Sequence, residues 1–305
     1  MKDQQYTLLR RVEAWAALPL IGLSRALPPR SRVALGHGLG RLAAQLDSRH
    51  RALAARQAEA ALGLSPDESD RLARAAFAHF GRVLVEVLAL PRYARPGAER
   101  LFAVEGLEHL TSALARDRGA FVFSAHFGNW ELVAMRQALA GHPMDFVARP
   151  LDNPWLDESF NRWRAVGGNR VLGKHGALRA VVRSLREGRA VAILVDQDIR
   201  GTPQVFVPFF GRLAATTSTM GELAVRTGAA VVPVVSFPRP DGGYRIVYQP
   251  ELEIPGPGGD VEARAHVVMA RATACVEGWI REQPAAWLWL HNRWKSRPKG
   301  EKLSR

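Results

Sequence analysis

The spacing of hydrophobic residues changes near Pro91 and divides the chain into two parts. Residues 4–90 have helical spacing, with breaks at Pro28-Pro29, Asp47-Ser48 and Ser65-Pro66. The last break has the residues of a helix start: an N-cap serine, a proline at the first helical position and acids in the first turn. We therefore predict a helical unit of residues 1–95, followed by a second unit of residues 96–305.

After Pro91, short β-branched runs alternate with helical patterns. The predicted strands cover residues 101–104, 120–125, 145–148, 190–195, 230–237 and 244–249. The predicted helices cover residues 107–116, 131–140, 154–166, 177–187, 216–227 and 261–282. A proline- and glycine-rich turn at 238–243 joins the last two strands. This alternation is typical of an α/β fold with a central, mostly parallel sheet flanked by helices.

The most apolar stretch, residues 12–27, is interrupted by Pro19 and Arg25 and is preceded by Arg10 and Arg11. It is shorter than the ~18 apolar residues of a membrane-spanning helix. No small-residue cleavage site follows cleanly, so we prefer an uncleaved segment that lies in a membrane interface to a signal peptide. The alternative is an ordinary N-terminal helix packed on the domain.

The charge of the chain indicates an anionic partner. Its 305 residues are 47% hydrophobic, enough for a real core, and the formal net charge is +13. A nucleic acid, a phospholipid surface, a phosphorylated substrate or an acidic protein would fit this charge. A compositional bias toward arginine and alanine would explain it without a partner. The single cysteine, Cys275, excludes a disulfide within the chain and a cysteine-based zinc site.

The segment GAFVFSAHFGNWE, residues 119–131, carries the strongest chemical signal. A buried strand leads into His126, which places this histidine at the carboxyl edge of the sheet, where open α/β sheets bind ligands. Asn129 is a candidate helix N-cap. Glu131 then falls in the first helical turn, where the helix N-terminus favours its charge. The pair predicts a general base with an orienting carboxylate. The alternative is a buried histidine satisfied by a nearby carboxylate.

Polar residues also follow two other predicted strands. Asp196 and Gln197 come after residues 190–195, where they could organise a site or simply form a turn. A metal site built from Asp196 and Asp198 lacks supporting ligand spacing. Arg149 ends the strand 145–148 and is a candidate to hold a phosphate or to stabilise an oxyanion, with a surface ion pair as the alternative.

Two aromatic runs complete the candidates. Phe210 and Gly211 belong to the run FVPFFG, whose phenylalanines could line a channel for a hydrocarbon chain or could be core. Residues 287–295 interleave three tryptophans with Arg293 and Lys295, which fits a membrane interface or stacking on nucleic-acid bases. The common nucleophile-elbow, P-loop and dinucleotide-binding motifs are all missing from the sequence.

Taken in order, these segments resemble the bacterial lipid A biosynthesis acyltransferase family, the late lauroyl and myristoyl transferases. The matching segments are residues 126–131, Arg149-Pro150 with Asn153-Pro154, Asp196-Gln197, residues 209–211 and residues 289–295. The resemblance covers nearly the whole chain. Asn292 stands where relatives often carry a second arginine.

The resemblance implies a glycerolipid-acyltransferase-like fold and a monotopic enzyme on the cytoplasmic face of the inner membrane. Such an enzyme moves a fatty acyl group from acyl carrier protein or coenzyme A to a hydroxyl of a phosphorylated lipid A precursor. We expect no metal, no cofactor beyond the acyl thioester and no nucleic-acid partner, and we expect an anionic membrane surface as a partner. The expected catalytic residues are His126 and Glu131. The expected substrate-binding residues are Asn129, Arg149, Asp196, Gln197, Phe210, Gly211 and Arg293.

The predicted mechanism is direct acyl transfer. His126 takes the proton of the acceptor hydroxyl, while Glu131 fixes the imidazole tautomer. No nucleophilic serine or cysteine adjoins His126, so we expect no acyl-enzyme. Three alternatives stay open: an acyltransferase for phosphatidylinositol mannosides, a sister branch that typically has aspartate at the position of Glu131; a lipid or thioester hydrolase; and a basic nucleic-acid-binding protein.

Overall fold

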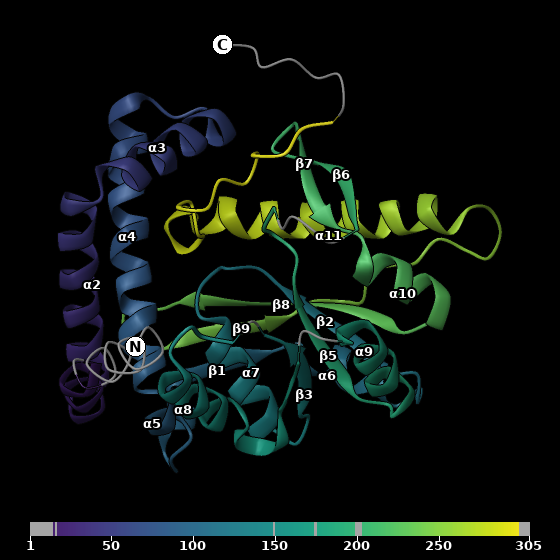
Figure 1. Cartoon of the computed structure of the whole chain (residues 1–305), viewed down its shortest axis with the longest axis horizontal. Helices are drawn as coiled ribbons and strands as arrows, with labels where there is room; N and C mark the ends of the chain where they lie inside the picture. The colour runs from purple at the N-terminus through teal and green to yellow at the C-terminus, as the bar shows by residue number, and fades with distance from the viewer. Residues whose placement is uncertain (1–14, 16, 149, 174–175, 199–202, 299–305) are drawn as a thin grey trace, which may run out of the picture.

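A seven-stranded sheet forms the centre of the computed structural model, which describes residues 15, 17–148, 150–173, 176–198 and 203–298 (Figure 1). The strand order is β1-β9-β8-β2-β5-β3-β4. The strands are β1 Phe102–Glu105, β2 Ala120–Ser124, β3 Met144–Val147, β4 Arg170–Leu172, β5 Ala190–Leu194, β8 Ala230–Pro238 and β9 Tyr244–Tyr248. β9 pairs antiparallel with β8, and the other pairs in this sheet are parallel. The predicted mostly parallel sheet is confirmed.

The six predicted strands all occur, and the structure adds three that the pattern missed. β4 is one of them. β6 Gln204–Phe209 and β7 Arg212–Thr217 form a separate antiparallel hairpin. The predicted helix start at Thr216 is wrong, because Thr216 pairs with Val205 in this hairpin and α10 begins only at Thr219.

Helices cover both faces of the sheet (Figure 1). They are α6 Leu107–Leu114, α7 Trp130–Leu139, α8 Pro154–Arg164, α9 Ala177–Arg186, α10 Thr219–Thr227 and α11 Val261–Glu282, with short turns α5 Leu90–Tyr93, η1 Ala98–Leu101, η2 Val166–Gly168 and η3 Pro284–Ala286. Alternate residues of β2 enter two separate cores. Phe121 and Phe123 share one core with Trp279 of α11, and Val122 packs with Leu110 and Leu132 in the other. A buried central strand with apolar residues on both faces is the expected result.

The N-terminal part contains the helices α2 Pro29–Leu46, α3 Ser48–Leu62 and α4 Pro66–Leu88, which follow the helical residues 17–26. The predicted breaks between them are confirmed. Ser65 and Glu68 form a reciprocal capping box at the start of α4. α2 and α4 lie side by side and approach each other through glycines (Figure 1). A Cβ atom on Gly40 would lie 2.1 Å from the carbonyl oxygen of Phe77, so the two backbones are in direct contact.

A buried ionic network attaches α4 to the sheet. Nε of Arg82 donates to Glu86 over 2.8 Å, and another guanidinium nitrogen donates to the carbonyl of Gly243 over 3.1 Å. Glu86 is fully buried and also accepts hydrogen bonds from the Tyr244 hydroxyl and the Asn129 amide. Burial and the charge of Glu86 raise the pKa of Tyr244, so the phenol stays a donor. The two predicted units are therefore packed together, and a boundary near residue 95 stays a prediction.

No helix among the described residues has the length and apolarity needed to cross a bilayer. Residues 12–14 and 16 of the predicted interfacial segment lie outside the described residues, and residues 17–26 are helical. Several large apolar side chains of the N-terminal helices are exposed: Trp15, Leu18, Leu23, Leu42, Leu46 and Leu84.

The contact between α2 and α4 predicts opposite effects for two substitutions in one helix. Gly40→Ala should lower the free energy of unfolding by ~1–3 kcal/mol, because the new methyl group meets backbone atoms that cannot move aside. Gly38→Ala should raise it by up to ~1 kcal/mol, because Gly38 has open space around it and alanine favours the helix. Urea unfolding followed by circular dichroism measures both. Stabilisation by both variants would contradict the close approach.

Candidate active site

His126 lies at the carboxyl edge of the sheet, as predicted. In the parallel pair of β2 and β5, Ser124 stands opposite Leu194. His126 and Asp196 each come two residues after that pair, so the register itself brings them together. They are separated by 70 positions in the chain.

Asp196 binds His126 twice. One carboxylate oxygen pairs with Nδ1 of the imidazole over 2.9 Å, and the other accepts the backbone N–H of His126 over 2.9 Å. The second oxygen also accepts Nε1–H of Trp287 over 2.8 Å. Asp196 is buried, whereas 19% of the His126 side chain is exposed. The site therefore has a buried anchor and an accessible ring.

The pKa of Asp196 is lowered despite its burial. Burial acts to raise this pKa, but the charge of the His126 imidazolium and the hydrogen bonds from His126 and Trp287 outweigh it. The carboxylate therefore stays ionised, and because it can only accept hydrogen bonds, Nδ1 of His126 is the donor in this contact. Nε2 is then left with its lone pair, which is the state required of a general base.

The expected pairing of Glu131 with His126 needs correction. The carboxylate of Glu131, in the first turn of α7, forms a two-point ion pair with Arg164 of α8, with one contact of 2.9 Å. The structure thus assigns the orientation of the imidazole to Asp196. The physical reason is that strand pairing places Asp196 under both the backbone and the ring of His126, whereas Glu131 faces α8. The catalytic role of Glu131 itself stays a prediction.

Asn129 is confirmed as the N-cap of α7, where its side-chain oxygen accepts the N–H of Leu132. Its amide nitrogen donates to Glu86 over 3.0 Å, and the residue has no exposed surface. We therefore do not retain its predicted contact with a substrate. The backbone of the neighbouring Gly128 lies directly against β8, since a Cβ atom there would lie 1.8 Å from the carbonyl oxygen of Ser236.

Phe210 and Gly211 form the two-residue turn between β6 and β7. Both have positive φ angles, 51° and 70°, as a tight hairpin turn requires. The backbone N–H of Phe210 donates to Glu277 over 2.7 Å, and its ring is buried against Phe209. Phe209 and Phe210 belong to the core, whereas Phe206 is partly exposed, and a role of this run in lining a hydrocarbon channel stays a prediction.

Arg293 is also an interior residue. It has no exposed surface, and its guanidinium donates to the carbonyl of Ala215 and the hydroxyl of Thr216 in β7. Burial lowers its pKa to about 10. This placement leaves no surface for the predicted substrate contact. Gln197 is partly exposed beside Asp196, and Arg149 lies outside the described residues.

The segment 287–296, called the C-terminal segment below, encloses the site in a way that the sequence pattern did not reveal. The N–H of Leu288 donates to the carbonyl of His126 over 3.0 Å. His291 accepts the N–H of Asp198 over 3.0 Å, and Ser296 donates to the Asp198 carboxylate. Its tryptophans are buried, so the predicted membrane-interface role for these rings is wrong. Among the described residues, no cluster of side chains suited to a metal ion occurs.

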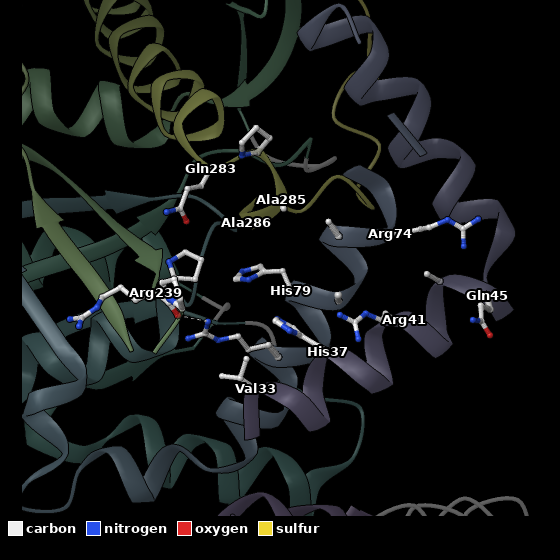
Figure 2. Close-up of a pocket in the computed structure, with 17 residues that line it drawn as sticks. Val33, His37, Arg41, Gln45, Arg74, His79, Arg239, Gln283, Ala285 and Ala286 are labelled. Atoms are coloured by element: carbon white, nitrogen blue, oxygen red, sulfur yellow. Dashed lines mark hydrogen bonds between the residues drawn. The ribbon is translucent and has the colours of Figure 1, made fainter. Parts of the chain in front are cut away.

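A groove of about 850 Å³ lies between α2, α4, the β8–β9 turn and residues 283–286. Figure 2 shows His37 and His79 projecting from the two helices toward the same space. The lining does not include His126. Nε2 of His79 donates to the carbonyl of Gly128 over 3.2 Å. Burial, with the nearby charge of Arg82, lowers the pKa of His79 to about 3. The neutral ring therefore holds the loop of residues 126–129 through Gly128.

Comparison with known proteins identifies the family. Residues 1–296 match the sequence profile of the bacterial lipid A biosynthesis acyltransferases. The chain belongs to this family. It is 32% identical over 289 residues to the lipid A biosynthesis lauroyltransferase of Escherichia coli (strain K12), which covers 94% of this chain and 92% of that protein.

Two further relatives show the breadth of the family. The lipid A biosynthesis palmitoleoyltransferase of Escherichia coli (strain K12) is 30% identical over 290 residues, with the same coverage of 94% and 92%. The phosphatidylinositol mannoside acyltransferase of Mycolicibacterium smegmatis is 29% identical over 232 residues, which is 75% of this chain and 74% of that protein. These relatives are acyltransferases by name, and this chain is an acyltransferase as a member of the family.

The buried His79 predicts a loss of stability in mild acid. Its pKa is about 3 in the folded chain and 6.5 when unperturbed, so the unfolded chain binds the proton more readily between these values. The free energy of unfolding should therefore fall as the pH drops below 6.5, by about 2 kcal/mol at pH 5 from this group alone.

His79→Gln keeps an N–H donor for the carbonyl of Gly128 and should remove this part of the pH dependence. His142→Gln, at a partly exposed loop position, is the matched control and should leave it in place. Urea unfolding at pH 7 and pH 5 gives the comparison. Equal acid sensitivity of the wild type and His79→Gln would show that His79 is not held neutral.

Proposed function

We propose that this chain transfers a fatty acyl group from an acyl thioester, carried by acyl carrier protein or coenzyme A, to a hydroxyl of a lipid A precursor. Membership of the family supports the reaction class, and the two Escherichia coli relatives, named for lauroyl and palmitoleoyl groups, support a fatty acyl group. The observation that carries the proposal is the accessible imidazole of His126, held by the buried, ionised Asp196.

The first step is removal of a proton from the acceptor. Nε2 of His126 takes the hydroxyl proton as the oxygen attacks the thioester carbonyl carbon, and Asp196 stabilises the imidazolium that forms. The C–O bond forms while the carbonyl π electrons move to oxygen. When the C=O bond reforms, the C–S bond breaks, and the departing sulfur takes the proton from the imidazolium. The products are an ester and a free thiol.

This mechanism uses no acyl-enzyme. The hydrogen bonds of His126 in the described structure go to Asp196 and to the backbone of the C-terminal segment, rather than to a serine or cysteine side chain. Cys275 lies on α11, and burial raises the pKa of its thiol, which disfavours the thiolate required of a nucleophile. The acceptor hydroxyl is therefore the nucleophile in the proposal.

Glu131 is retained as a catalytic candidate with an electrostatic role. It lies five positions after His126, at the N-terminus of α7, where Arg164 holds its carboxylate in one orientation. A fixed negative charge in this region would favour the imidazolium formed during transfer. The charge of Arg164 partly offsets that of Glu131, so the effect of Glu131 should be smaller than that of Asp196.

We also propose peripheral attachment to the cytoplasmic face of the inner membrane. The exposed apolar side chains of the N-terminal helices would enter the interface, and the net charge of +13 would attract anionic lipids. The mannoside branch is the second candidate for the acceptor, supported by its match to 75% of the chain. The 94% match to lipid A enzymes favours the lipid A precursor.

The proposed pair predicts a ranking of three variants. His126→Ala should reduce the rate of transfer by ~10²- to 10⁴-fold, since it removes the general base. Asp196→Asn should approach the same loss, because an amide donor in place of an oxygen favours the wrong tautomer of His126. Glu131→Gln should lose less than either. The assay is transfer from acyl carrier protein thioester to a lipid A precursor, with folding checked by circular dichroism.

Asp241→Asn, at a partly exposed ion pair in the β8–β9 turn, is the control and should transfer at the wild-type rate. Glu131→Gln with a greater loss than Asp196→Asn would reverse the assignment of the orienting carboxylate. Thioester cleavage that is equally fast without acceptor would instead support the hydrolase alternative.

The attachment surface predicts a dependence on one exposed leucine. Leu46 on α2 is 78% exposed, and Leu46→Ser should weaken binding to anionic vesicles about 5-fold or more, since the apolar burial of the side chain is lost. Leu178→Ser on α9 is the matched control, at 56% exposure. Vesicle co-sedimentation at two salt concentrations measures both, and wild-type binding should fall as salt rises. Equal weakening by both variants would argue against an N-terminal attachment face.

A further inference from the structure

A second groove, of about 440 Å³, lies between α3 and the C-terminal segment. Its lining residues are Arg49, His50, Leu53, Arg56, Leu290, His291, Asn292 and Lys295. The volume is in the range of small-molecule sites, which is ~300–1,000 Å³. None of the predicted catalytic or substrate-binding residues lines it, so it is a hollow separate from the site described above.

The groove combines three cations without a carboxylate in its lining. The side chains of Arg49, Arg56 and Lys295 are exposed, and none of them has an ion-pair partner within the part of the chain that the structure describes. Asp47, the N-cap of α3, lies outside the lining and pairs with His50 over 2.7 Å. The hydrogen bonds from His50 lower the pKa of Asp47, and the charge of Arg49 also helps to lower it. Three unpaired cations around one hollow create a positive potential that an anion would relieve.

The larger groove of Figure 2 differs in this respect. It is also lined by arginines, but three of them are already paired with acids. These pairs are Arg74 with Asp70, Arg82 with Glu86 and Arg239 with Asp241. Of the two grooves, the smaller one therefore has more cations without an ion-pair partner among the described residues.

The walls of the smaller groove are held together by buried hydrogen bonds. The amide nitrogen of Gln57 on α3 donates to the carbonyls of Trp289 and His291 over 2.8 Å each. Its oxygen accepts the N–H of Arg293 over 2.9 Å. Gln57 is buried, so these bonds fix the C-terminal segment against α3. The cations of α3 and Lys295 are thus presented on a preorganised frame, which lowers the entropic cost of binding.

The same segment connects the groove to the catalytic pair. Trp287, which binds Asp196, is four positions before His291, so the two Cα atoms are at most ~14 Å apart. His291 accepts the N–H of Asp198, only two residues after Asp196. Burial lowers the pKa of His291, so the ring is neutral with its proton on Nδ1, a hydrogen-bond donor. A long substrate anchored in the groove could therefore extend to His126.

We propose that this groove binds a phosphate group carried by one of the two substrates. Arginine offers forked donors that match phosphate oxygens, and lysine adds a compact charge. The assignment of the phosphate to a substrate rests on the proposed function, whereas phosphate binding itself does not. Two sources share this chemistry: the phosphates of the thioester donor and the sugar phosphates of the acceptor.

Direct binding measurements test the proposal without using activity. The probes are free coenzyme A for the donor and a diphosphorylated glucosamine disaccharide without acyl chains for the acceptor. Isothermal titration compares the full-length wild type with the double variant Arg56→Gln/Lys295→Gln at low salt. The double variant should bind at least one probe ~10-fold or more weakly, since two charge-assisted contacts are lost.

Arg179→Gln/Arg183→Gln is the matched control. It removes the same charge from exposed positions on α9, which Figure 1 shows far from α3. This control should bind both probes as the wild type does. The single variant Arg49→Gln provides a further test if the double variant is unstable, with an expected loss of several-fold.

The pattern of losses identifies the source of the phosphate. Loss of coenzyme A binding alone assigns the groove to the donor, and loss of disaccharide binding alone assigns it to the acceptor. Unchanged affinity for both probes, or equal loss in the α9 control, overturns the proposal. A wild type that binds a probe through this groove but transfers no acyl group would refute the proposed function while the phosphate site stands.

Discussion

The buried carboxylate of Asp196 is the interaction on which the rest of the site depends. It accepts hydrogen bonds from the backbone and the ring of His126 and from the indole of Trp287. Burying an ionised carboxylate without such partners would cost free energy, so the buried Asp196 requires all three donors to be in place. This requirement couples the pairing of β2 and β5 to the position of the C-terminal segment. The imidazole of His126 is therefore oriented only when both of these contacts have formed.

A second buried carboxylate holds the other end of the same loop. Glu86 of α4 binds Asn129, three residues after His126, and also binds Arg82 and Tyr244. The loop of residues 126–129 is thus held by Asp196 at one end and by Glu86 at the other. Gly128 of this loop lies against the backbone of Ser236 in β8. Asn129 and Gly128 thereby help to set the position of the His126 imidazole.

The arginines of this basic chain fall into two groups, those paired within the protein and those left exposed. Many of its cations already have partners within the protein, as in the ion pair of Arg164 with Glu131 or the hydrogen-bonded, buried guanidinium of Arg293. Such residues add to the net charge but offer little to a partner. The cations between α3 and the C-terminal segment are different, because they surround a hollow without a carboxylate in its lining. Net charge alone could not separate these two groups.

Features that depend on local spacing could be predicted from the order of residues alone. These include the six main strands, the helix breaks, the capping residues Ser65 and Asn129, and the place of His126 at a strand end. The carboxylate that pairs with His126 could not be predicted in this way, because Asp196 lies 70 positions away and the contact arises from strand register. The same holds for the buried tryptophans and for Arg293, whose polar and aromatic pattern resembles a surface until the interior partners are known. The turn at Phe210 was also hidden, because a positive φ at phenylalanine is uncommon and carries no sequence signal. Local patterns report on neighbours in the chain, whereas the partners of buried polar groups are chosen by packing between distant segments.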